Sequence, residues 1–208
     1  MLANRLKILL AERDLTIKKV IEETGISRNV LSNMINKPFS NVSNANIDRL
    51  CNFLEISPSD FWVYTPWLFR YFTRPGSDVE DDNLVINSTA VMTVQAINGK
   101  IKRNTTFAFY LWNNDKIDIF DGTIYTVRVL YDNKGGFKEI FDSLSPVFQH
   151  SIQSKIVRTA SSFLESAIKN HELNPATIDG EPISIYVCSN EDTGHPLFIS
   201  KLTMNGLV

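Results

Sequence analysis

The feature that most constrains the fold of this chain is a stretch near its N-terminus, residues 16–36, with the sequence TIKKVIEETGISRNVLSNMIN. Apolar residues recur at helical spacing before and after Gly25, which predicts two helices. Gly25 stands where a residue of left-handed conformation would end the first helix. Thr16 and Ser27 each precede a helical pattern and are favourable N-caps. The stretch therefore predicts a helix, a tight turn and a second helix with a polar outer face.

Similar patterns on either side extend this unit into a domain of five short helices over residues 1–64. The first helix is expected over residues 2–13, with Asn4 on its polar face, and the next two over 17–24 and from 28 to about 36. A fourth helix is expected over residues 44–54, and Ser57-Pro58 begins a fifth that ends near Phe61-Trp62. The expected inward residues of the fourth helix are Ile47, Leu50, Cys51 and Leu54. The N-terminal region is thus predicted to be all-α.

Two strings of residues in this region match a known pattern. The first runs from Asn4 to Asn36 and reads N-R-L-K-x-L-L-x-E-R-x-L-T-I-K-x-x-x-E-x-T-G-I-S-R-x-x-L-S-x-x-I-N, and the second is LEISPSDF at residues 54–61. Together they resemble the Cro/CI-type, or Xre-type, family of phage and bacterial repressors. The departures are Val20-Ile21, where the family usually has Leu-Ala, and Lys37-Pro38, where it commonly has a glycine. The resemblance implies a helix-turn-helix that binds a double-stranded DNA operator as a two-fold homodimer.

The second helix of the pair has an outer face suited to contacts with bases. A helix that starts at Arg28 presents Arg28, Asn29, Ser32 and Asn33 outward, and the resemblance places base contacts at these positions. Arginine can bond a guanine edge with two hydrogen bonds, and asparagine can do the same with adenine. The alternative is a solvated polar face, which would normally carry more Glu and Lys and fewer short amides.

Contacts to the DNA phosphates need donors on both sides of that helix. Helix N-termini also favour an anion through their free N–H groups. The candidates are Thr16, Lys18, Lys19, Ser27, Asn36, Lys37, Ser40, Asn41 and Asn44.

Charge and composition give weaker guidance. The net charge is −2, and residues 1–64 carry 8 Lys/Arg against 7 Asp/Glu. Nucleic-acid binding must therefore depend on where the positive charges point rather than on their total. No apolar run is long enough to span a bilayer and no signal peptide pattern begins the chain, so a cytoplasmic protein without membrane contact is expected. Cys51 and Cys188 are far apart, and buried free thiols are favoured over a disulfide or metal site.

A connecting segment is expected over residues 65–83. Its first part is aromatic, with Trp67, Phe69, Tyr71 and Phe72 following Tyr64, and either closes the N-terminal core, docks onto the next domain or forms a partner-binding patch. Its second part, residues 74–83, is acidic and contains Pro75 and Gly76, which is typical of a hinge.

The rest of the chain, residues 84–208, predicts an α+β domain for dimerisation or regulation. Strands are expected over 85–96, 105–112, 116–120 and 123–131, with turns at Asn98-Gly99 and Asp121-Gly122. A long helix over about 147–171 and two final strands over 181–188 and 196–204 follow. The expected order is an antiparallel meander, a long helix and a final hairpin.

This second domain shows no catalytic, metal-binding or cofactor motif. Many repressors of this class carry a self-cleaving domain with a Ser–Lys dyad, but its Gly-Asp-Ser-Met-like turn and its cleavable Ala-Gly or Cys-Gly bond are absent here. Ser200 and Lys201 are adjacent on an expected strand, so they point to opposite faces. No enzymatic activity and no cofactor are expected.

Three hypotheses for function follow. The first is a prophage-type repressor that occludes a promoter, with a second domain that assembles subunits or binds an antirepressor protein. The second is a ligand-sensing regulator with a small-molecule pocket lined by Phe107, Phe109, Tyr125 and Phe163. The third is an antitoxin-like interaction protein whose C-terminal half neutralises a partner.

Overall fold

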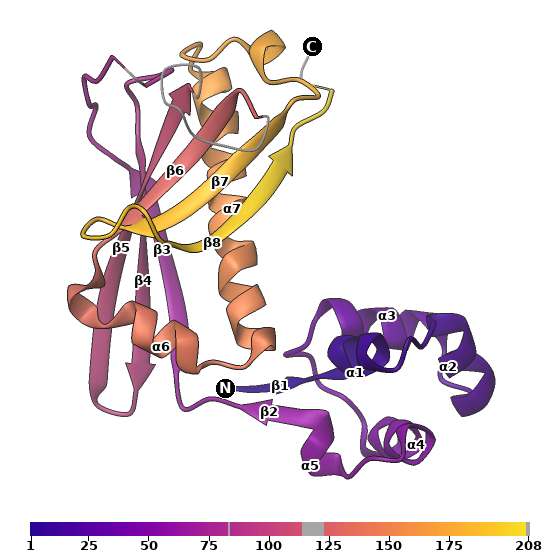
Figure 1. Ribbon diagram of the computed structural model, residues 1–208. Coiled ribbons are helices and arrows are strands. Elements are labelled where there is room, and N and C mark those ends of the chain that lie inside the picture. The colour runs from indigo at the N-terminus through magenta and orange to yellow at the C-terminus, as the bar shows by residue number, and fades with distance from the viewer. Residues whose placement is uncertain (83, 114–122, 207–208) are drawn as a thin grey trace. The chain divides into compact units, whose positions relative to one another are not determined.

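The chain divides into two compact units in a computed structural model that describes residues 1–82, 84–113 and 123–206 (Figure 1). The first unit contains Met1–Trp67 with Leu144–Gln149, and the second contains Leu68–Ser143 with His150–Val208. Helices and strands both occur, as expected for a mixed fold, and each unit has its own hydrophobic interior.

The first unit consists of short helices closed by a small sheet. The elements in chain order are β1 (Leu2–Asn4), α1 (Leu6–Glu12), α2 (Ile17–Thr24), α3 (Arg28–Asn36), α4 (Asn44–Leu54), α5 (Pro58–Phe61) and β2 (Trp62–Tyr64). Strands β1 and β2 pair antiparallel, with Ala3 opposite Val63. The prediction of an all-α region is therefore wrong at its two ends. The backbone of residues 2–4 pairs with a distant strand instead of starting the first helix, because burial of Ala3 and Asn4 requires partners for their backbone groups.

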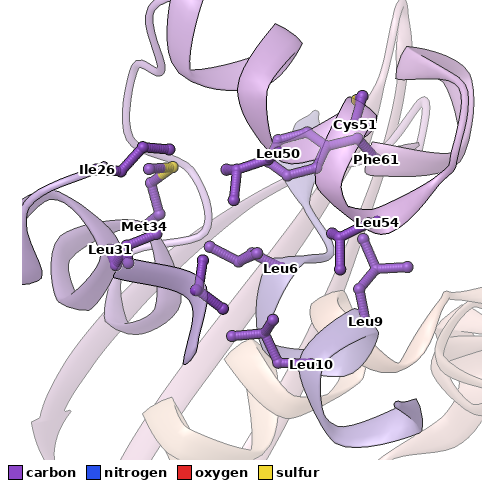
Figure 2. Close-up of a cluster of buried hydrophobic side chains, with 11 residues drawn as sticks. Leu6, Leu9, Leu10, Ile26, Leu31, Met34, Leu50, Cys51, Leu54 and Phe61 are labelled. Atoms are coloured by element: carbon purple, nitrogen blue, oxygen red, sulfur yellow. The ribbon is translucent and has the colours of Figure 1, made fainter. Parts of the chain in front are cut away.

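Side chains from all the longer helices of this unit meet in one interior. Leu6 and Leu9 come from α1, Leu31 and Met34 from α3, and Leu50 from α4, as Figure 2 shows. Phe61 of α5 closes the cluster with its ring at 5.2 Å from that of Trp62, edge to face. Burial of these apolar side chains fixes α3 on the body of the unit and leaves its opposite side to solvent.

Gly25 ends α2 in the left-handed conformation that the sequence predicts. Its φ is 68°, and its N–H donates to the carbonyl of Ile21 at 2.9 Å. A Cβ built at this position meets nothing within 4 Å, so an added methyl group would strain only the backbone. We expect Gly25→Ala to lower the free energy of unfolding by about 1–2 kcal/mol. Urea denaturation measures this loss, and Gly25→Asn should recover part of it because asparagine tolerates this conformation.

The second unit is built on a six-stranded sheet in the order β3-β4-β5-β6-β7-β8. Its strands are β3 (Leu68–Pro75), β4 (Ala90–Asn98), β5 (Ile101–Asn113), β6 (Tyr125–Tyr131), β7 (Pro182–Ser189) and β8 (Pro196–Thr203). All neighbouring strands are antiparallel except β6 and β7, which are parallel. Helices α6 (Phe137–Ser143) and α7 (Pro146–Lys169) lie in the connection between those two strands.

The sheet differs from the sequence prediction at its first strand. Residues 68–75, which we assigned to a connecting segment, form β3 and pair along their whole length with β4. Alternate residues Phe69 and Tyr71 are half-buried while Arg70 and Phe72 are exposed, which is the period of a strand with one covered face. The expected strand over 116–120 and the turn at 121–122 lie outside the described residues.

Helices α6 and α7 cover one face of this sheet (Figure 1). The hydroxyl of Thr159 on α7 lies 3.5 Å from the sulfur of Met92, and the ammonium of Lys155 lies 5.9 Å from the ring centroid of Tyr71. Phe107 packs edge to face against Phe137 of α6 at 5.2 Å. Phe107 and Phe109, proposed above as pocket residues, are fully buried in this layer.

Both cysteines are free and buried, which confirms that prediction. Burial raises the pKa of the Cys188 thiol, so the neutral form is favoured. Within the described part of the chain, no helix has the length and apolar character needed to cross a membrane.

Candidate nucleic-acid interface

Helix α3 presents a short polar face to solvent. Arg28, Asn29 and Asn33 are exposed on it, and Ser32 beside them is half-buried. On the opposite side of the same helix Leu31 has no exposed surface and Met34 has 2%. The buried pair holds the helix in place, so the four predicted base-contacting residues lie on a rigid element. Val30, 38% exposed, adds an apolar group at the margin.

The N-termini of α2 and α3 are capped as the sequence predicts. The hydroxyl of Thr16 accepts a hydrogen bond from the N–H of Lys19 at 3.3 Å, and that of Ser27 accepts one from Val30 at 3.4 Å. Each hydroxyl keeps its own hydrogen to donate, and the remaining N–H groups of the first turn stay open. Both caps can therefore donate to a phosphate oxygen without losing their structural bond.

The predicted phosphate-binding lysines differ in their surroundings. Lys18 lies 3.9 Å from Glu22 and Lys19 pairs with Glu23, each one turn along α2. The hydrogen bond that Lys19 donates to the Glu23 carboxylate raises the pKa of Lys19, and this carboxylate offsets part of the positive charge. Among the described residues, Arg28 and Lys37 have no carboxylate partner. Uncompensated positive charge is thus present at both ends of α3.

The loop after α3 is fixed by Asn4, a residue whose position in the sequence predicts an exposed helix face. Asn4 is 2% exposed, and its amide donates to the carbonyls of Met34 at 3.2 Å and Pro38 at 3.1 Å. Its carbonyl oxygen accepts from the N–H of Leu6 at 3.1 Å. The last turn of α3 and the following loop are therefore tied to the first strand. No helical periodicity signals this role, because it depends on a backbone pairing between distant segments.

The loop residues predicted to bind phosphate do not all face solvent. Asn36, Lys37, Asn41 and Asn44 are exposed, whereas Ser40 is half-buried. The hydroxyl oxygen of Ser40 is fully buried and has no hydrogen-bond partner among the described residues. The structure therefore brings Asn36 and Lys37 beside the exposed face of α3 and leaves Ser40 directed inward.

The N-terminal region, which contains this surface, matches a known family of DNA-binding domains. Residues 5–66 match the Cro/C1-type HTH DNA-binding domain. The match covers α1 to β2 and includes the polar face of α3, so a DNA-binding regulator is supported. No curated protein and no solved structure matches the chain.

The match to the Cro/C1-type domain ends at residue 66 and does not extend into the second unit. Ser200 and Lys201 are successive residues of β8, opposite Ile185 and Ser184. Their side chains point to opposite faces of the sheet, so they do not form a nucleophile–base pair.

Proposed function

We propose that this protein is a sequence-specific transcription regulator of prophage-repressor type, which binds operator half-sites as a homodimer and thereby occludes a promoter. The observation that supports the proposal best is the exposed face of α3. Arg28, Asn29, Ser32 and Asn33 stand together there, next to donors that can fix the helix against phosphates. In this assignment α3 enters the major groove, and its N-terminal residues contact base edges.

Dimeric binding is part of the proposal because one such helix contacts few base pairs. Residues 1–64 have a net charge of only +1. A single domain therefore gains little from nonspecific attraction to the phosphate backbone. Two domains joined through residues 84–208 would bind half-sites about 34–36 Å apart, one helical turn of DNA. An antirepressor protein that binds the C-terminal unit would release the operator.

Selection of bound fragments from a random DNA pool tests this assignment. We expect a motif with two-fold symmetry and half-sites separated by about one turn. An asymmetric motif would rule out the symmetric dimer, and failure to enrich any motif would rule out sequence-specific binding.

Lys37 provides a separate test of the phosphate contacts. We expect Lys37→Ala to weaken binding uniformly across DNA sequences and to reduce the salt slope of log K by about 0.9. Fluorescence anisotropy over a series of salt concentrations measures the slope. Lys7→Ala is the control, because Lys7 is an exposed lysine on α1 to which we assign no contact. An unchanged slope for Lys37→Ala would remove this residue from the interface.

A further inference from the structure

The face of the C-terminal sheet opposite α6 and α7 is a feature that the proposed function leaves unexplained. Strand alternation places Tyr71, Met92 and Phe107 on the helix-covered face, as their contacts show. The neighbouring residues of the same strands point the other way. We call the part of this face formed by β3, β4 and β5 the open sheet face. Its principal residues are Arg70, Phe72, Arg74, Gln95, Lys102 and Asn104.

The distribution of charge over the sheet is one-sided. Strands β3 to β8 contain no Asp or Glu, but they contain six Lys and Arg residues. The register places Arg103 on the helix-covered face, where it donates to the carbonyl of Gly135 at 2.9 Å. The other cations lie on the opposite face, at Arg70, Arg74, Lys102, Arg128 and Lys201.

The acids of this unit lie in its helices and connections. Asp132 follows β6, and its backbone N–H donates to the carbonyl of Thr106, so it borders the open sheet face. Its carboxylate accepts the N–H of Lys134 at 2.9 Å. In the described part of the chain, Arg70, Arg74 and Lys102 have no ion-pair partner. The three cations of the open sheet face therefore have no carboxylate partner among the described residues, and the acids Asp78, Glu80, Asp81 and Asp82 follow β3 in the chain.

An aromatic ring stands between these cations. Phe72 is 55% exposed, and it lies between Arg70 and Arg74 on the same side of β3, about 7 Å from each along the strand. Across the strands, Arg70 of β3 is paired with Gln95 of β4, which is paired with Asn104 of β5. The side-chain amide of Gln95 donates a hydrogen bond of 3.0 Å to the amide oxygen of Asn104. A large exposed ring, flanking guanidinium groups and a pair of amides thus share one surface.

We propose that the open sheet face binds single-stranded nucleic acid. Arg70, Arg74 and Lys102 bind phosphates, a base stacks on Phe72, and the amides of Gln95 and Asn104 bond base edges. Charge complementarity selects this occupant over a second copy of the chain. A symmetric contact between two open sheet faces would bring like charges together, which is unfavourable.

The experiment measures binding of a fluorescein-labelled oligothymidylate to the full-length protein by fluorescence anisotropy. We expect a slope of log K against log salt concentration of about −2, from three cations at about 0.7 each. The double variant Arg70→Glu/Lys102→Glu should lose about tenfold or more in affinity. Phe72→Ala should lose about tenfold, while Phe72→Tyr keeps a stacking ring and binds as the wild type does. Circular dichroism verifies that each variant is folded.

The matched control is Arg158→Glu, which reverses the charge of an exposed arginine on α7 and should leave the affinity unchanged. Equal affinity of the double variant and the wild type would overturn the proposal. An equal loss of affinity in Arg158→Glu and in the double variant would also overturn the proposal. The oligonucleotide would then be attracted by the overall charge of the protein and not by the open sheet face. If polyglutamate at equal charge displaces the oligonucleotide, the proposal is wrong, and the open sheet face binds an acidic protein instead. None of these outcomes depends on operator binding by α3, which is measured separately with double-stranded DNA.

Discussion

Replacement of Arg28 by alanine is expected to lower affinity for the selected operator by about 1–3 kcal/mol per half-site, and a dimer suffers this loss twice. The physical reason is that two hydrogen bonds to one guanine edge disappear while the desolvated base remains. The variant should also accept other base pairs at that position. Anisotropy titrations against the operator and its single-base variants measure both effects.

We expect Asn33→Ala to cause a similar loss of affinity and specificity at a different base pair, because the amide of Asn33 is suited to an adenine edge. Arg49→Ala on α4 is the control, since it removes an exposed arginine from the same unit without altering α3. Wild-type affinity and specificity in Arg28→Ala would show that this side chain does not contact a base. Equal losses in Arg28→Ala and Arg49→Ala would indicate a general charge effect instead.

Phe61→Ala is expected to reduce the free energy of unfolding of the first unit by about 3–5 kcal/mol. Phe61 has no exposed surface, and its ring packs at the side of the cluster in Figure 2, next to Leu50 and Cys51. Its removal leaves a cavity next to Leu50 and Leu54, which cannot collapse fully onto it. Because α3 is packed on the same cluster, operator binding at elevated temperature should fall together with stability.

Hydrogen exchange of amides in α1 to α4 measures this loss without interference from the second unit. Tyr64→Ala is the matched control, since its ring is 72% exposed and its removal should change stability by less than about 0.5 kcal/mol. Similar losses in the two variants would contradict the assignment of Phe61 to the core.

The sequence predicts the local structure of the helix-turn-helix well because its signals are local. Thr16, Gly25 and Ser27 determine where α2 and α3 begin and end through bonds to residues at most four positions away. The alternation of Leu31 and Met34 with Asn29 and Asn33 sets which side of α3 is buried. A single sequence is enough for such features.

Features that depend on distant partners were not predicted. Asn4 has a short polar side chain that fits an exposed helix position equally well, and only the pairing of β1 with β2 explains its burial. Strand β3 contains Arg70 and Arg74 and ends in Pro75, so its composition resembles a connecting segment. An edge strand tolerates these residues because one of its sides needs no partner.

The parallel pairing of β6 with β7 has a consequence for synthesis of the protein. These two strands are neighbours in the sheet, but residues 132–181 separate them in the chain. When the ribosome has completed β6, the backbone edge of this strand has no partner until β7 emerges. Val127 and Val129 of β6 lie on the face that α6 and α7 cover, so they stay uncovered until those helices have been made. A fragment that ends before Pro182 contains both helices but exposes the unpaired backbone edge of β6, which favours aggregation.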